Sequence, residues 1–195
     1  MRTLERSIQA VPAGFPCGVR TPRGKLRWYL VYTGEGREQS TCEKVKRLVD
    51  SSLLEDAFVM QRERWFKRAG AWSLIPVQMY RGYFFVATRD AAGLDKAFSK
   101  LSFPVQIAGA LDHAYMPMSF DAQAWFTAAM DADHVLRNSL AVIVDGELRV
   151  QHGPLVGQER RVKKINRHKR SCLVSIPGTT ADSTEQLPID IPFKS

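Results

Sequence analysis

The sequence has few cysteines and few histidines, and neither residue type is arranged as a site. Among its 195 residues are three cysteines and four histidines. They lie far apart, without the HExxH or Cys-Xaa2-Cys spacing of metal ligands. An odd number of scattered cysteines also argues against a disulfide framework. We therefore expect a cytoplasmic protein that holds no metal and no structural disulfide.

The short motifs of common enzymes are absent as well. The sequence contains no GxSxG nucleophile elbow, no Walker A loop and no cysteine and histidine in a helpful local context. Its carboxylates are dispersed along the chain rather than paired. We expect a binding protein, with no catalytic residues and no cofactor.

Acidic residues are outnumbered by basic ones. Lysine and arginine total 28 against 20 aspartate and glutamate, which gives a net charge of +8 and a pI near 9.6. Such an excess predicts a polyanionic partner, either a nucleic acid or an anionic membrane. A membrane would require a run of about 18 apolar residues, a lipidation motif or a basic amphipathic helix. None is present, so we expect nucleic acid.

The densest run of basic residues lies in residues 150–176, which read VQHGPLVGQERRVKKINRHKRSCLVSI. The only acidic residue there is Glu159, and interspersed valine, isoleucine and leucine favour strands over a solvated tail. We predict a rigid basic surface whose nucleic-acid contacts are Arg160, Arg161, Lys163, Lys164, Arg167, His168, Lys169 and Arg170. The alternative is that these charges only keep a small domain soluble.

A second basic segment lies on a predicted hairpin. Two β-rich arms within residues 57–88 flank Arg68-Ala69-Gly70, a tripeptide typical of a hairpin tip. Arg62, Arg64, Lys67 and Arg68 alternate there with Trp65, Phe66 and Trp72. Such a surface can stack bases and bind phosphates. Equally, the two tryptophans can be a cross-strand pair that stabilises the hairpin.

Local patterns predict an α+β fold. A strand is expected at residues 28–33, a helix begins with a Ser40–Glu43 capping box, and further helices start near Asp90 and Ser119. The Asp145-Gly146 dipeptide is a strong signal for a later hairpin. We predict a flexible extension at residues 1–25, a first domain at 26–131, a linker at 132–139 and a small β-domain at 140–195.

The basic segment resembles a known module. The stretches GPLVGQE at residues 153–159 and KKINRHKR at 163–170 are similar to the KOW module of NusG-type transcription elongation factors, and most like the paralogues called LoaP. The resemblance implies a five-stranded, SH3-like β-barrel at residues 140–195. It departs at Arg160, where KOW modules have glycine. Either the turn is rebuilt, or Arg160 tolerates a left-handed backbone.

The first domain carries the same resemblance. YRGYFFV at residues 80–86 is similar to the Phe-Pro-Gly-Tyr strand of the NusG N-terminal domain, and PMSFDAQAWFTAAMD at 117–131 is similar to its last helix. This implies an antiparallel sheet flanked by helices that binds the clamp helices of the largest RNA polymerase subunit. The implied polymerase contacts are Trp28, Tyr29, Tyr80, Gly82, Tyr83 and Phe85. Aromatic residues on a central strand are also typical of a core.

Together these features predict a bacterial, cytoplasmic, nucleoid-associated factor that promotes processive antitermination. It would act as a monomer, binding RNA polymerase through its first domain and a structured leader RNA through the KOW domain. Other elongation factors or a ribosomal protein are further candidate partners of the KOW domain. The alternative is a structural RNA-binding KOW protein of the ribosomal type, which has no need of the strand at residues 28–33 and the aromatic strand at 80–86.

Overall fold

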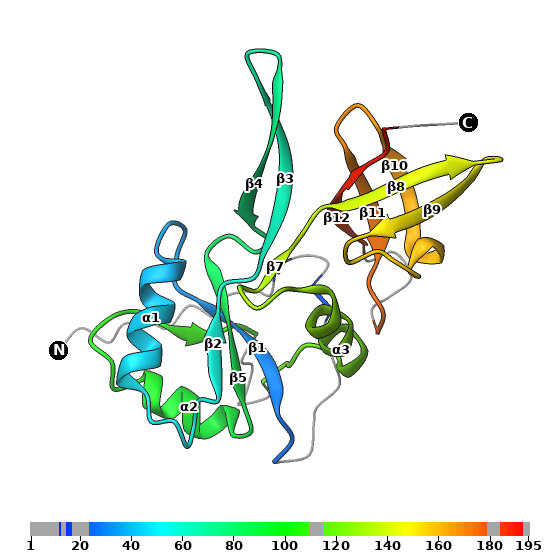
Figure 1. Ribbon diagram of the computed structural model, residues 1–195. Helices are drawn as coiled ribbons and strands as arrows, with labels where there is room; N and C mark the ends of the chain where they lie inside the picture. Colours follow the sequence, from blue (N-terminus) through cyan, green and yellow to red (C-terminus); the bar gives the residue numbers. More distant parts are fainter. Residues whose placement is uncertain (1–11, 13–14, 17–23, 110–114, 179–183, 193–195) are drawn as a thin grey trace. The chain divides into compact units, whose positions relative to one another are not determined.

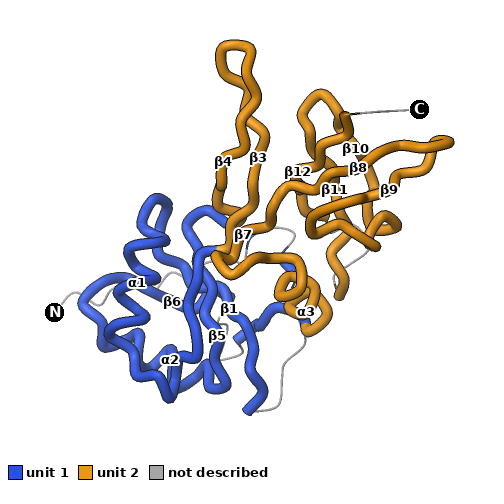
Figure 2. Tube along the Cα trace, viewed as in Figure 1, with its two compact units in different colours: residues 1–59, 80–119 blue, residues 60–79, 120–195 orange. Residues whose placement is uncertain are grey.

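The computed structural model describes residues 12, 15–16, 24–109, 115–178 and 184–192 (Figure 1). Its described part contains three α-helices and several sheets, which confirms the expected mixture of helix and strand. The chain divides into two units, Met1–Val59 with Tyr80–Ser119 and Met60–Met79 with Phe120–Ser195 (Figure 2). Each unit is therefore assembled from two stretches of sequence, and the boundaries predicted along the chain stay predictions.

The first unit is built on a four-stranded antiparallel sheet. Its strands are β1 (Arg27–Tyr32), β2 (Asp56–Phe58), β5 (Tyr83–Thr88) and β6 (Gln106–Ile107), in the order β2-β5-β1-β6. The strand predicted from its aromatic and β-branched residues is β1, which lies inside the sheet between β5 and β6. Burial of both its faces explains its nearly continuous apolar sequence.

Two helices complete the core of this unit. The helices α1 (Glu38–Leu48) and α2 (Ala91–Phe98) contribute apolar side chains to one cluster with alternate residues of β1 and β5. Alternation places every second strand residue on the helix side of the sheet. The fully buried members of this cluster include Val31, Val45, Phe84, Val86 and Leu94.

The two helix starts show where local signals succeed and where they fail. The predicted start of α2 near Asp90 is confirmed, and the Asp90 carboxylate caps the helix by accepting a hydrogen bond from the N–H of Gly93 at 3.0 Å. The predicted capping box at Ser40 is wrong, since Ser40 lies inside α1 and its hydroxyl donates to the carbonyl of Arg37. The helix begins earlier, at Glu38, whose buried carboxylate accepts the N–H of Gly82 at 2.6 Å.

The second unit contains the predicted hairpin. Strands β3 (Gln61–Arg68) and β4 (Ala71–Gln78) pair over their whole length and form a long, twisted ribbon (Figure 1). Ala69 and Gly70 form the tip with φ angles of 48° and 83°, which confirms the predicted turn. At its other end β3 pairs in parallel with β7 (Val135–Leu136), a buried strand within the stretch predicted as a linker.

A five-stranded sheet follows the short helix α3 (Phe120–Ala129) and β7. Its strands are β8 (Ser139–Val144), β9 (Glu147–His152), β10 (Val162–Asn166), β11 (Ser171–Ser175) and β12 (Thr184–Asp190). They are ordered β10-β11-β12-β8-β9, and only the β12 and β8 pair is parallel. We call it the C-terminal sheet. Its description as an SH3-like KOW barrel stays a prediction.

The turns of the C-terminal sheet resolve the question raised by Arg160. This residue lies in a short 3-10 helix, Glu159–Arg161, and its φ is not positive. Arg160 therefore carries no left-handed backbone strain. The carboxylate of Glu159 accepts the N–H of Val150 at 3.1 Å. Hydrogen bonds from its own backbone N–H and from Val150 hold the pKa of Glu159 below its ordinary value.

Gly153 combines a left-handed backbone with close backbone neighbours, so it leaves no room for a side chain. Its φ is 95°, and an added Cβ would lie 2.6 Å from the carbonyl oxygen of Asn138 and 2.7 Å from the Cα of Ser139. Gly146, in the β8–β9 turn after Asp145, has a φ of 81° but nothing within 4 Å of an added Cβ. An alanine would have a strained backbone at both positions, but its Cβ would clash with neighbouring atoms only at Gly153.

We therefore expect Gly153→Ala to lower the free energy of unfolding by about 2–5 kcal/mol, because strain and overpacking add. Gly146→Ala serves as the matched control and should cost only about 1–2 kcal/mol. Urea denaturation followed by circular dichroism measures both. Equal losses in the two variants would contradict the close packing at Gly153.

Candidate nucleic-acid interface

The two basic segments predicted from the sequence meet at one groove within the second unit. The β3–β4 hairpin, the loop of residues 167–170 and β12 line a pocket of about 360 Å³, which we call the basic groove. Six of the predicted nucleic-acid contacts line it: Arg62, Arg64, Lys67, His168, Lys169 and Arg170. Residues far apart in the sequence therefore contribute to a single positively charged surface.

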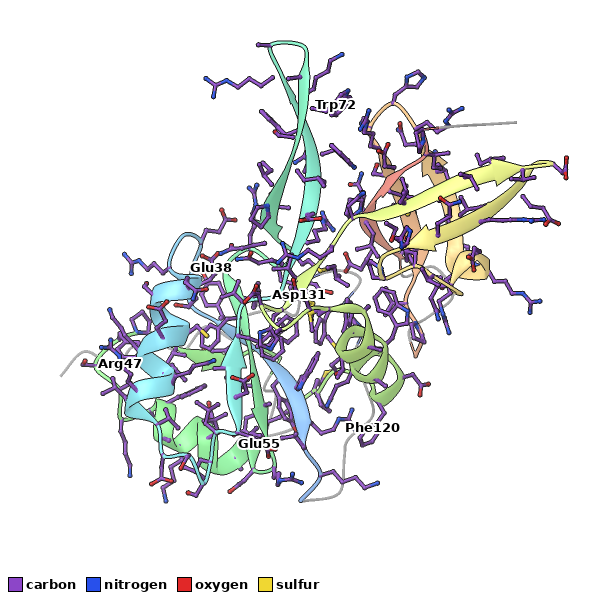
Figure 3. All side chains as sticks on the ribbon, viewed as in Figure 1. Glu38, Arg47, Glu55, Trp72, Phe120 and Asp131 are labelled. Carbon is purple, nitrogen blue, oxygen red and sulfur yellow. The ribbon has the colours of Figure 1, made fainter. Side chains whose placement is uncertain are left out.

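The aromatic residues of the hairpin form the wall of the basic groove. Trp65 and Trp72 pack edge to face, with ring centroids 6.4 Å apart and planes at 89°. Trp72 lies near the tip of the hairpin (Figure 3), directly opposite Lys67 in the register of β3 and β4. The indole N–H of Trp65 donates to the Oδ1 of Asn138 at 2.9 Å. The cross-strand pair is thus present, and both rings also line the groove.

Arg170 connects the loop to the hairpin. Its Cζ lies 4.5 Å from the ring centroid of Trp65 and 5.1 Å from that of Trp72, which are cation–π distances. The same guanidinium lies 3.5 Å from the carboxylate of Asp190 on β12. A left-handed backbone at Arg170, with φ of 45°, directs the chain out of the loop and into β11. Stacking and pairing together hold this side chain at the groove.

Acidic groups near the basic groove are already neutralised. Glu185 on β12 lies 3.6 Å from the guanidinium of Arg62. Glu63, which lines the groove, is 3.2 Å from Arg137, and its other oxygen accepts the N–H of Asn138 at 2.7 Å. The carboxylates are therefore engaged, and the remaining lysines keep the groove electropositive.

The other predicted cations lie elsewhere on the second unit. Arg68 is exposed beside the hairpin tip, and Arg160 is exposed on the 3-10 helix. Arg161 is partly buried and donates from Nε to the Oε1 of Gln158 at 2.9 Å. Three further predicted cations, on β10 or in the loop after it, are exposed and form no ion pair within the described part of the chain: Lys163, Lys164 and Arg167.

The residues implied as polymerase contacts lie in the first unit, and most of them are buried. Trp28, Tyr29, Tyr80, Gly82 and Phe85 are all buried, whereas Tyr83 is partly exposed. Phe85 packs against the rings of Trp28 at 6.3 Å and Tyr80 at 5.6 Å. Phe15 joins this cluster, 5.8 Å from Tyr80. Of the six, Tyr83 therefore has the most surface for a partner.

Cys42 and Cys172, the cysteines that the structure describes, give no sign of reactive chemistry. Burial raises the pKa of Cys42 to about 11 and that of Cys172 to about 12, so both thiols stay protonated near neutral pH. No three histidine, cysteine or acidic side chains in the described part are grouped to hold a metal ion. No helix among the described residues is long and apolar enough to cross a membrane.

Some residues that line or support the basic groove carried no signal in the sequence. Asn138, which fixes the Trp65 ring, is 73 positions away from it in the chain. Gln186 and Ser171 line the groove itself, and the amide of Gln186 donates to the Ser171 hydroxyl at 2.9 Å. Neither belongs to a motif. Only the pairing of β11 with β12 brings them together.

The contact between Arg170 and the tryptophans should be measurable as a coupling energy. In a double-mutant cycle, Arg170→Ala and Trp72→Leu should be non-additive by about 0.5–2 kcal/mol, because each removes the same cation–π contact. Urea denaturation of the four proteins gives this value. The control cycle pairs Arg170→Ala with Ile75→Ala, an exposed residue of β4 that does not line the groove. Additive effects in both cycles would contradict the contact.

Comparison with known proteins adds little to this geometry. No protein-family model matches the sequence, and no curated protein matches it. A solved structure described as "Domain interaction in Thermotoga maritima NusG" aligns over 85% of this chain and 94% of that chain, with 13% sequence identity and a TM-score of 0.44. A likeness this distant assigns no function.

Proposed function

We propose that this chain is a NusG-like transcription elongation factor. In this proposal the first domain binds RNA polymerase at the clamp helices of its largest subunit, and the C-terminal domain binds RNA. Two tethered contacts would keep the factor on the elongating enzyme and give antitermination that depends on a leader RNA, as in the LoaP-like paralogues. The protein would act as a cytoplasmic monomer.

The observation that carries the RNA-binding part is the set of unpaired cations on the C-terminal sheet. Lys163 and Lys164 extend from β10, and Arg167 lies in the loop that follows. All three are exposed, and none has an acidic partner among the described residues. Cations held on a sheet at fixed spacing bind phosphates at less entropic cost than cations on a flexible tail. This arrangement favours a polyanion as the partner.

The polymerase-binding part is supported by sequence resemblance and by one accessible aromatic residue. The stretch similar to the polymerase-binding strand of NusG proteins includes β5 and the turn that precedes it. Tyr83, at the start of β5, is partly exposed and packs against Tyr32 at 5.4 Å between ring centroids. These two tyrosines offer an amphipathic surface of the kind that protein interfaces favour.

A structural RNA-binding protein of the ribosomal type is the second candidate. It would share the basic C-terminal sheet, so that sheet does not discriminate. The first unit discriminates by expectation, because a ribosomal KOW protein has no need of the strand at residues 28–33 and the aromatic strand at 80–86. Those features favour the polymerase-bound factor. Co-purification of the full-length chain with RNA polymerase, rather than with ribosomal subunits, separates the two candidates.

RNA binding by the full-length chain should depend strongly on salt. Each phosphate contact lowers the slope of log affinity against log salt by about 0.7 for a single strand and 0.9 for a duplex. We expect the doubly substituted Lys163→Gln and Lys164→Gln chain to bind RNA more weakly, with a slope shallower by about 1–2. Filter binding over a range of salt concentrations measures both quantities.

The control replaces an exposed lysine of the first unit, Lys100→Gln, which should leave affinity and slope unchanged. A flat salt dependence in the wild-type chain would overturn the RNA-binding part. Retention of ribosomal subunits instead of polymerase would overturn the polymerase part and favour the second candidate.

A further inference from the structure

We propose that the basic groove binds an unpaired stretch of nucleic acid, with one base against the aromatic wall and its phosphates at Lys67 and Lys169. This rests on the proposed function only in taking nucleic acid as the partner. It adds a second binding surface to the cations of β10, and it gives the hairpin a role in recognition. The form of nucleic acid that the groove selects is a single strand.

The size and lining of the groove suit a nucleobase. A volume of about 360 Å³ lies at the lower end of the range for small-ligand pockets, about 300–1,000 Å³. Its walls combine flat apolar rings with a few polar groups, as such pockets do. Phe66 is 47% exposed and Trp72 is partly exposed, so aromatic surface is open to a ligand. The groove therefore has room for a stacked base and rings on which to stack it.

The charges around these rings suit a nucleic-acid backbone. The Nζ of Lys67 lies 5.7 Å from the Trp72 ring centroid, so this ammonium group adjoins the stacking surface. Lys169 and His168 are exposed on the loop of residues 167–170, which also lines the groove. Cations thus come from the hairpin and from the C-terminal sheet. A strand that places a base between them meets positive charge from both elements.

An unpaired strand fits this arrangement better than a duplex. In a duplex each base is already stacked and paired, so its face is closed to a tryptophan. Proteins that bind single strands combine a basic groove with aromatic side chains on which bases stack. The basic groove has both features. The exposed lysines of β10, in contrast, offer charge without aromatic rings and can bind either form.

Arg170 acts as a positioning residue in this site. Its guanidinium lies against both indole rings and beside Asp190. This contact connects the hairpin to the C-terminal sheet and fixes the orientation of Trp72 before a ligand arrives. A preformed site loses less entropy on binding. The Gln186 amide and the Ser171 hydroxyl, on β12 and β11, supply polar groups for the edge of a bound base.

The test uses the full-length chain and fluorescently labelled oligonucleotides of about ten nucleotides, a length within the range of single-strand binding sites. The probes are a single-stranded RNA, a single-stranded DNA of the same sequence and an RNA duplex. Fluorescence anisotropy gives the affinity for each. Comparing RNA with DNA shows whether the 2′-hydroxyl contributes.

We expect Trp72→Ala to weaken binding of a single strand roughly 5- to 100-fold, because stacking on one base is lost. Trp72→Phe keeps a flat ring and should stay within roughly threefold of wild type. The matched control is Ile75→Ala on the same strand, which should change nothing. Affinity for the duplex should be nearly equal in all of these proteins. Circular dichroism confirms that each variant is folded.

Two outcomes would overturn this inference. One is unchanged single-strand affinity in a folded Trp72→Ala variant while the Lys163 and Lys164 substitutions still weaken RNA binding; the proposed function then stands without the groove. The other is an equal loss for duplex and single strand in Trp72→Ala, which indicates a general effect on the domain. Failure of the wild-type chain to bind any RNA would instead reject the RNA-binding part of the proposed function.

Discussion

The basic groove depends on the contact of the Arg170 guanidinium with the indole rings of Trp65 and Trp72. The other links between the hairpin and the chain around the C-terminal sheet are the ion pair of Arg62 with Glu185 and the hydrogen bonds of Trp65 and Glu63 to Asn138. A partly exposed ion pair contributes about 1 kcal/mol or less. The planar guanidinium adds stacking on two rings, and this brings the charge of the loop beside the aromatic surface of the hairpin.

Features that depend on neighbours in the chain were predictable from the sequence. The hairpin tip at Ala69-Gly70 and the helix cap at Asp90 follow from local backbone preferences and hydrogen bonds. Features that depend on residues far away in the chain could not be predicted from the sequence. The first residue of α1, Glu38, accepts a hydrogen bond from Gly82, 44 positions away, and no local capping pattern can reveal this contact.

In the candidate site, too, local features were predictable from the sequence and long-range contacts were not. Composition and alternation identified the basic residues of both segments and the two tryptophans, because charge and aromatic content are visible in any sequence. That the two segments line one groove follows from the pairing of β3 with β7 and from the packing of β12 beside β3. This packing also brings Asn138 to Trp65 and Glu185 to Arg62, and no sequence motif indicates either contact. Residue types thus gave the chemistry of the site, and tertiary contacts gave its location.

The central claim is that the hairpin and the C-terminal sheet form one binding surface. Nuclear magnetic resonance of the full-length, 15N-labelled protein tests it most directly, because each tryptophan indole N–H gives its own signal. On titration with a single-stranded RNA, we predict that the indole signals of Trp65 and Trp72 shift together with the backbone amides of residues 167–171. Shifts confined to β10 and its loop, with both indole signals unmoved at saturation, would contradict it.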